Sequence, residues 1–254
     1  MTTYLIPCRL ESTRYPNKPL LDICGLPMFA HVYFRTLMAV GDNNNVFVCT
    51  HNYEIMEECE RLNIEYIETD RLPVNGTERI AQAADKLGLS GSDIVVNVQG
   101  DDPMVNPEDL IALANYHKKN SDVDIILPHI KMEEPRTDLL SGHIVTDSYD
   151  NILLISRNPI PSNFRKKIPY KKILSIQSFR ADALYEFEAE PETDLEKIEG
   201  IEHLRAIDMG LNIKTFELEQ EYTPVDVPEQ YEIVRKKMVD DPLFLEYSHL
   251  VTKE

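Results

Sequence analysis

The chain has 254 residues, 43% of them hydrophobic, and a formal net charge of −18. That length suits one large α/β domain or two small ones, and the hydrophobic content can build a core without disulfides or metal. The excess of acidic residues argues against nucleic acid or an anionic membrane as the partner, and no apolar run is long enough to span a membrane.

The first half of the sequence alternates segments typical of strands and of helices. Strands are expected at residues 3–8, 45–50, 64–69 and 93–100, and helices at 26–40, 53–62, 76–89 and 106–119. Repeated β-α-β units predict a Rossmann-like, mostly parallel twisted sheet with helices on both faces. Ligands of such sheets bind beyond the carboxyl ends of the strands.

The second half has more strands and fewer helices. Strands are expected at 124–130, 142–148, 151–156, 171–179 and 212–219, and helices at 193–209 and 228–238. We expect them to form a smaller mixed or antiparallel extension of the sheet. A basic, exposed loop is expected at 164–172. Because no linker composition or repeat divides the chain, residues 1–254 are predicted to form a single domain.

The opening stretch "IPCRLESTRYPNKPL", residues 6–20, gathers cations near the N-terminus of an acidic chain. It carries two arginines, one lysine and two hydroxyl side chains: Arg9, Arg14, Lys18, Ser12 and Thr13. It contains no glycine, so it is neither a Walker A loop nor a dinucleotide fingerprint. Arginine and lysine side chains bind phosphate oxygens, and prolines stiffen the loop. The pattern favours a triphosphate site over a basic surface loop that pairs with nearby acids.

Carboxylates follow the strand at 93–100. Gln99, Asp101 and Asp102 stand at its end, and Asp226 precedes a predicted helix. Magnesium prefers hard oxygen ligands, often one or two carboxylates together with substrate phosphates. These aspartates and the cations therefore predict a metal–triphosphate site. The alternatives are a turn residue for Asp101 and a helix-start residue for Asp226.

These residues together resemble the CMP-Kdo synthetase (3-deoxy-manno-octulosonate cytidylyltransferase) family of sugar-acid cytidylyltransferases. Its signature P-x-R-x-x-S-T-R-x-P-x-K-P-L is filled by residues 7–20. The blocks "GLPM", "NGTERIAQ", "VVNVQGDDP", "ISRNPIP" and "PVDVPEQ" also follow in the family's order. The resemblance extends over roughly residues 2–240.

The resemblance implies a reaction in which the anomeric hydroxyl of a 2-keto sugar acid attacks the α-phosphorus of CTP and pyrophosphate leaves. It implies that the catalytic residues are Arg9, Arg14, Lys18 and Asp101, and that Mg²⁺ binds Asp101 and Asp226. Implied nucleotide contacts are Pro7, Arg9, Ser12, Thr13, Arg14, Lys18, Arg79 and Gln99. Implied sugar contacts are Gln99, Ile173, Gln177, Arg180, Glu196 and Glu199.

The same resemblance implies that three parts of the chain have different functions. Residues 1–120 would bind CTP, residues 121–220 would bind the sugar acid and form a homodimer, and residues 221–254 would supply the second metal ligand and a C-terminal helix.

The chain departs from the family pattern at three positions, two of which bear on the acceptor. Ile173 and Gln177 stand where the family has histidine and tyrosine near the sugar acid, and His51 follows Thr50 where it tends to have aspartate. The acceptor is therefore the eight-carbon acid itself, its 8-amino form, another 2-keto acid or a phosphonate. A nucleotide-binding protein without turnover is the second alternative. Glu196 also fits a helix capping box.

The four cysteines form no C-x-x-C pair, which predicts buried, reduced thiols. The N-terminus has no basic segment followed by a long apolar run, so no signal peptide is expected. Both features indicate a cytoplasmic protein.

Overall fold

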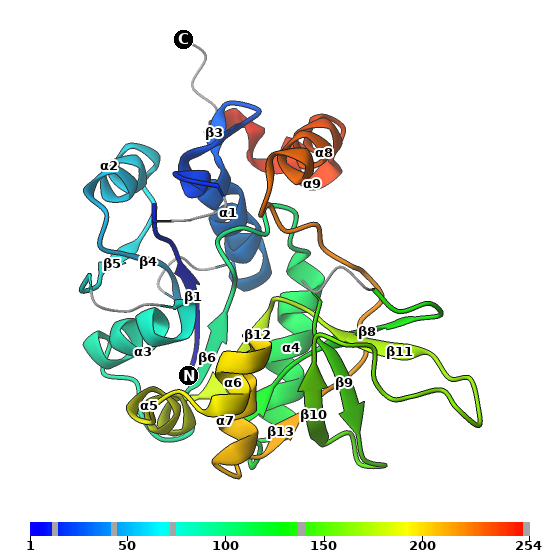
Figure 1. Ribbon diagram of the computed structural model, residues 1–254. Helices are drawn as coiled ribbons and strands as arrows, with labels where there is room; N and C mark the ends of the chain where they lie inside the picture. The colour runs from blue at the N-terminus through cyan, green and yellow to red at the C-terminus, as the bar shows by residue number, and fades with distance from the viewer. Residues whose placement is uncertain (12–14, 42–44, 72–74, 137–140, 251–254) are drawn as a thin grey trace.

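The centre of the protein is a seven-stranded sheet, shown in Figure 1 by a computed structural model that describes residues 1–11, 15–41, 45–71, 75–136 and 141–250. The strand order is β13-β7-β12-β6-β1-β4-β5, and among these strands β12 alone runs antiparallel to its neighbours. The strands are β1 (Thr2–Pro7), β4 (Val46–Thr50), β5 (Tyr66–Glu68), β6 (Ile94–Asn97), β7 (Ile125–Ile126), β12 (Gln177–Arg180) and β13 (Ile213–Lys214). The predicted α/β fold with a mostly parallel sheet is confirmed.

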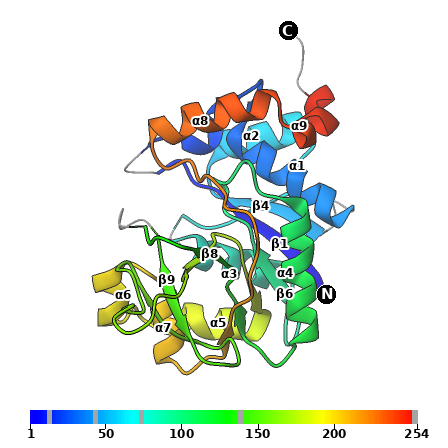
Figure 2. The same cartoon turned by 90° about the vertical axis from the view of Figure 1, so that its right-hand side faces the viewer.

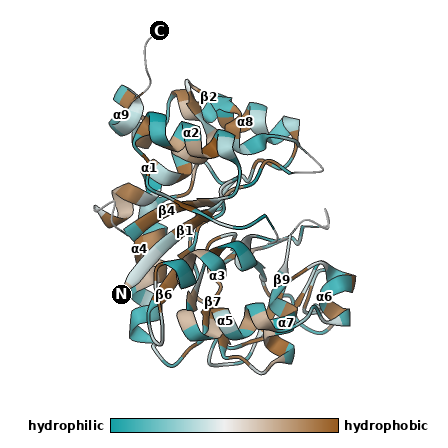
Figure 3. Cartoon of the chain, turned by 90° about the vertical axis from the view of Figure 1, so that its left-hand side faces the viewer, coloured by the Kyte–Doolittle hydropathy of each residue, from teal (hydrophilic) through white to brown (hydrophobic). Residues whose placement is uncertain are grey.

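Helices cover both faces of this sheet, because successive side chains of a strand point to opposite faces. Ile6 of β1 belongs to one buried cluster, with residues of α1 and α4, whereas Leu5 belongs to another, with residues of α3 and α5. These helices are α1 (Met28–Val40), α2 (Tyr53–Leu62), α3 (Gly76–Lys86), α4 (Pro107–Lys119) and α5 (Ala181–Ala189). Hydrophobic colour concentrates on β4, and the helices around it carry both colours, as expected of amphipathic helices (Figure 3).

The second half extends the central sheet through β12, β7 and β13, as expected of a mixed extension, and also forms a second sheet. A separate antiparallel sheet has the order β10-β9-β11-β8. Its strands are β8 (His129–Met132), β9 (His143–Thr146), β10 (Ile152–Ser156) and β11 (Tyr170–Ile173). The expected strands at 124–130 and 171–179 are each divided between the two sheets. The first of these runs leaves the central sheet at Pro128, because proline cannot donate to a strand ladder. The Pro128 carbonyl accepts a hydrogen bond from the Leu174 N–H at 2.9 Å.

The expected helix at 193–209 is two short helices. Gly200 ends the first in the left-handed conformation, at φ 62°, which glycine adopts without steric cost. The helices of this region and of the C-terminus are α6 (Asp194–Glu199), α7 (His203–Asp208), α8 (Pro228–Val239) and α9 (Pro242–Tyr247). Two short strands, β2 (Asp22–Ile23) and β3 (Leu26–Pro27), and two 3₁₀ turns, Lys18–Leu20 and Ser248–Leu250, complete the described elements.

A long segment connects β13 to α8 and crosses the molecule from the side of α7 to the side of α1 (Figure 2). Along its path the Val225 N–H donates to the Asp101 carbonyl at 2.9 Å. This contact brings Asp226 to the carboxyl end of β6. In the part of the chain that the structure describes, no helix has the length and apolar character needed to cross a membrane.

Buried histidines should make the fold sensitive to acid. Burial lowers the pKa of His31 and of His129 to about 4. As the pH falls, these histidines take up protons in the unfolded chain before they do so in the folded one. The stability that comes from burying them uncharged is therefore fully present above about pH 6.5 and is lost as the pH approaches 4. We expect each histidine to lower the free energy of unfolding by about 2 kcal/mol between pH 7 and pH 5.

Urea unfolding at the two pH values measures this loss. His31→Gln should reduce the difference, whereas the exposed His249→Gln should leave it unchanged. Equal stability of the unmodified protein at pH 7 and pH 5 would contradict the prediction.

Candidate functional site

The carboxyl ends of β1 and β6 lie against each other and against the start of α3. A Cβ atom on Gly76 would lie 3.3 Å from Pro7 Cγ and 3.6 Å from Gln99 Oε1. A Cβ atom on Gly100 would lie 2.7 Å from Cys8 Sγ and 2.9 Å from the Pro7 carbonyl oxygen. Glycine is therefore required at position 100 for this close approach. The approach directs the following aspartate to the sheet edge.

Lys18, Asp101 and Asp226 meet at this edge from three distant parts of the sequence. Lys18 Nζ lies 2.6 Å from Asp101 Oδ2 and 3.0 Å from Asp226 Oδ1. Burial alone would lower the pKa of Lys18, but the charges and hydrogen bonds of the two carboxylates outweigh it and raise that pKa. The two carboxylates thus converge on one positive charge.

Asp102 faces away from this cluster, although it is next to Asp101 in the sequence. Its side chain is fully buried and accepts a hydrogen bond from Ser175 Oγ. Burial, reinforced by the charge of Asp101, raises the pKa of Asp102 to about 7. The strand end therefore presents one carboxylate to the edge and keeps the other in the interior.

Two guanidinium groups lie close to each other near the same edge. Arg79, on the first turn of α3, is 1% exposed and donates to Thr69 Oγ1 and to the Asp70 carbonyl. Burial lowers the pKa of Arg79, and the charge of exposed Arg9 adds to that effect. Their proximity creates positive potential that favours an anion. The predicted contacts Ser12, Thr13 and Arg14 lie outside the described residues.

Gln177 lies opposite Asn97 in the β12–β6 register, two residues before Gln99. It is 3% exposed, and its Oε1 accepts a hydrogen bond from His203 Nε2. Ile173 packs in β11, where a Cβ atom on Gly142 would lie 2.9 Å from Ile173 Cδ1.

The contacts that join α7 to this region were not expected from the sequence. Thr77 Oγ1 of α3 donates to Glu202 Oε1 at 2.6 Å. The side-chain oxygen and nitrogen of Asn97 are buried and have no hydrogen-bond partner among the described residues. The only signal in the sequence is that "LEKIEGIEHLR", residues 195–205, resembles a helix block of the family in which Glu202 is retained.

Three other predicted sugar contacts are engaged elsewhere. Glu196 Oε1 accepts a hydrogen bond from Arg205 at 2.9 Å, and Glu196 closes the capping box of α6. Glu199 accepts hydrogen bonds from Ser156 Oγ at 2.9 Å and from the Arg157 N–H at 2.8 Å. Arg180 pairs with Ile94 at the start of β6, which is the opposite edge of the sheet. The structure therefore does not bring these three side chains to Lys18, and their roles stay predictions.

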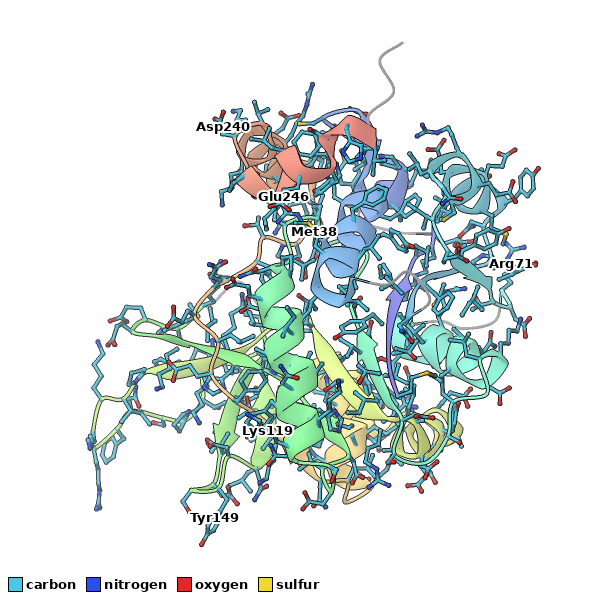
Figure 4. All side chains as sticks on the ribbon, turned by 180° about the vertical axis from the view of Figure 1, so that it is seen from behind. Met38, Arg71, Lys119, Tyr149, Asp240 and Glu246 are labelled. Carbon is cyan, nitrogen blue, oxygen red and sulfur yellow. The ribbon has the colours of Figure 1, made fainter. Side chains whose placement is uncertain are left out.

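A cavity of about 570 Å³ lies beside the opening loop, at the ends of β4 and β5. It is lined by Glu11, His51, Asn52, Tyr53, Glu54, Glu68, Thr69, Asp70 and Arg71. Arg71 is labelled in Figure 4, where its side chain extends outward from the ribbon. Thr69 and Asp70 connect this cavity to Arg79, so it adjoins the cationic part of the edge.

This arrangement can bind a phosphate chain and a cation. Lys18, Arg9 and Arg79 provide positive charge, and Asp101 and Asp226 provide hard oxygen ligands. The described residues contain no group of three or more His, Cys, Asp or Glu side chains that could hold a metal. Any cation here would therefore need further ligands from water or a substrate.

Comparisons with known proteins give one consistent result. A family model described as Cytidylyltransferase matches residues 3–215. The chain is 32% identical to the 8-amino-3,8-dideoxy-manno-octulosonate cytidylyltransferase of Shewanella pealeana over 94% of this chain and 99% of the relative. It is 34% identical to the 3-deoxy-manno-octulosonate cytidylyltransferase of Syntrophus aciditrophicus over 91% of this chain and 94% of the relative. A solved structure of CMP:2-keto-3-deoxy-manno-octonic acid synthetase complexed with CTP superposes with TM-score 0.85 at 31% identity, over 94% of this chain and 98% of that one.

Proposed function

The chain belongs to the cytidylyltransferase family, and from this premise we propose that it transfers CMP from CTP to the anomeric hydroxyl of a 3-deoxy-manno-octulosonate (Kdo) type sugar acid and releases pyrophosphate. Membership makes it a CTP-dependent nucleotidyltransferase. The observation that carries the proposal is the meeting of Lys18, Asp101 and Asp226 at the carboxyl edge of the sheet.

The triphosphate of CTP fits the positive side of this edge. Arg9 and Arg79 lie close enough for one charge to lower the pKa of the other, and a polyanion between them would relieve that repulsion. Lys18 adds an ammonium group at the end of the opening loop. Phosphoryl and nucleotidyl transfer depend mainly on positioning and charge neutralisation, which these side chains supply.

Magnesium fits the negative side. Asp101 Oδ2 and Asp226 Oδ1 both lie within 3.0 Å of one ammonium nitrogen, so the two oxygens point to a common cation position. Mg²⁺ is commonly held by one or two carboxylates plus substrate phosphates. When bound it would neutralise the charge that develops on the phosphates. We therefore propose Mg²⁺ as the cofactor, held by Asp101 and Asp226.

The chemistry at this site would be a single displacement. The anomeric oxygen of the acceptor forms a bond to the α-phosphorus, and the bond from that phosphorus to the oxygen bridging to the β-phosphorus breaks. Pyrophosphate leaves, and the hydroxyl proton passes to solvent. Lys18 and Arg9 would hold the leaving phosphates throughout.

The acceptor is proposed to be an eight-carbon 2-keto acid. The relatives that act on Kdo and those that act on its 8-amino form match to nearly the same extent, at 34% and 32% identity. Gln177 is buried against His203 rather than directed into open space, and Ile173 is apolar. Because a site built to hydrogen-bond a hydroxyl discriminates through those bonds, both changes favour a modified acceptor.

We also propose that the enzyme is a cytoplasmic homodimer joined through its second half. All four cysteines are free thiols, which supports a reducing compartment. The β9–β10 hairpin exposes three large apolar side chains: Tyr149, Leu153 and Leu154. Tyr149 projects outward at the tip of that hairpin (Figure 4).

The test of the function is pyrophosphate release with CTP and MgCl₂, using Kdo and 8-amino-Kdo as parallel acceptors. Turnover with either confirms the reaction class, and the ratio of kcat/KM values identifies the substituent at carbon 8. CTP binding without turnover on either acceptor would reject these acids and favour another acid or a binding protein. EDTA should abolish the release, and added Mg²⁺ should restore it.

A further inference from the structure

Two residues that follow β4 hold the start of the opening loop. The Leu10 N–H donates to Asn52 Oδ1 at 3.1 Å, and His51 Nε2 bonds Glu11 Oε1 at 3.0 Å. The Asn52 side chain also helps to lower the pKa of the Glu11 carboxyl. We call these four residues, Leu10, Glu11, His51 and Asn52, the loop clasp.

Asn52 makes these bonds instead of capping its own helix. It is the N-cap residue of α2, but its side chain makes no cap hydrogen bond there. Asn106 occupies the same position at α4 and does cap it, accepting from the Glu108 N–H at 3.1 Å. An asparagine cap ordinarily stabilises a helix. Its use on Leu10 therefore indicates a role in positioning the loop.

His51 can donate a hydrogen bond to its partner, the Glu11 carboxylate. Burial acts to raise the pKa of Glu11, but hydrogen bonds from its own backbone, His51 and Asn52, together with the charge of His51, outweigh it and lower that pKa. The Glu11 carboxylate therefore accepts the hydrogen bond from His51 Nε2. An aspartate at position 51 could not donate to it and would repel it.

The loop clasp connects directly to Lys18. The Leu10 carbonyl accepts a hydrogen bond from the Asn17 N–H at 3.2 Å. Asn17 has a left-handed backbone, at φ 56°, and the next residue is Lys18. Leu10 thus links the two sides of the loop. Its N–H is held by Asn52, and its C=O is held by Asn17, the residue before Lys18.

The loop clasp restrains Arg9 on one side, and a backbone bond to β4 restrains it on the other. The preceding residue, Cys8, donates its N–H to the Cys49 carbonyl at 2.9 Å. The following residue, Leu10, is held by Asn52. Arg9 therefore has its backbone fixed on each side, near Arg79.

We propose that Asn52 and His51 are positioning residues for the triphosphate of CTP, acting through the backbone of the opening loop rather than by touching the substrate. This inference rests on the proposed function, because it assigns Arg9 and Lys18 to the triphosphate. Holding the two cations in place before CTP arrives lowers the ordering cost of binding.

The test measures CTP affinity by titration calorimetry and both KM values by pyrophosphate release, using the full chain. We expect Asn52→Ala to weaken CTP binding about 10-fold and His51→Ala about 3-fold, with the acceptor KM changed less than about 2-fold. Asn106→Ala is the matched control, since it removes an asparagine at a helix start outside the loop clasp. It should leave CTP affinity unchanged.

Exchanging the hydrogen-bond donor and acceptor between positions 52 and 11 distinguishes a role in positioning the loop from a role in overall stability. Asn52→Asp keeps an oxygen for the Leu10 N–H but faces Glu11 with a like charge, so CTP binding should weaken. Adding Glu11→Gln supplies a donor in its place and should restore most of the affinity.

Three results would overturn the proposal. These are unchanged CTP affinity in Asn52→Ala, an equal effect in Asn106→Ala, and an Asn52→Asp/Glu11→Gln double variant no better than Asn52→Asp. Wild-type turnover tests the function separately. If the wild type binds CTP without turnover, the loop clasp is still judged by affinity; if it binds no CTP, both proposals are wrong.

Discussion

Asp101→Ala should reduce kcat/KM for CTP by about 10³-fold or more, roughly 4 kcal/mol of transition-state stabilisation. The physical reason is that Asp101 Oδ2 is one of two carboxylate oxygens that converge on the cation position at the sheet edge. Without it, the proposed Mg²⁺ keeps a single protein ligand, and Lys18 loses its shorter ion pair.

The fold should survive this substitution. The Asp101 side chain is 25% exposed, and the backbone bond from the Val225 N–H to the Asp101 carbonyl does not depend on the side chain. Asp122→Ala, at an exposed aspartate remote from the edge, is the control and should keep full activity. Steady-state pyrophosphate release and thermal unfolding measure the two properties. A near-normal rate in Asp101→Ala would mean that the site lies elsewhere.

Lys18→Met should also lower kcat/KM for CTP by at least about 100-fold, because it removes one of the positive charges placed at the triphosphate. It should change the free protein as well. Lys18 separates two carboxylates, and its raised pKa means that its stabilising effect is complete below about pH 10 and is lost as the pH rises through that pKa. At pH 7.5 the variant leaves Asp101 and Asp226 facing each other without a counter-charge.

Magnesium without nucleotide therefore provides a second measurement. MgCl₂ should raise the Tm of Lys18→Met by about 2–4 °C more than that of the wild type, because the Lys18 ammonium no longer occupies the position between the two carboxylates. Lys236→Met, at an exposed lysine on α8, is the control. Equal responses of the three proteins to MgCl₂ would show that the two carboxylates do not form a cation site.

The elements that could be predicted from the sequence are those with a strong local signal. α2 occupies residues 53–62 as expected, and α1 ends at Gly41 in the left-handed conformation that glycine permits. Asn106 caps α4 through its side chain. In each case the helical period, the cap and the stop lie within one segment, so the sequence and the tertiary structure favour the same element.

The elements that were predicted wrongly are those whose form depends on distant partners. Each of the apolar runs 124–130 and 171–179 contributes to two different sheets. Two residues of β7 are a strand only because β12 and β13 pair with them. Helix α5 was not predicted, since its stability comes from packing against α3 and β12.

The candidate site shows the same division. The sequence by itself determined the chemistry, namely a stiff cationic loop after β1, a carboxylate after β6 and the family to which these belong. The resemblance had already implied Asp101 and Asp226 as a pair, and only the tertiary structure showed that both contact Lys18, that Asp102 is buried, and that Asn52 holds Leu10. The reason is that residue type and local spacing encode backbone preference and charge, whereas contacts across 40 or more positions depend on how the packed sheet and its connections close.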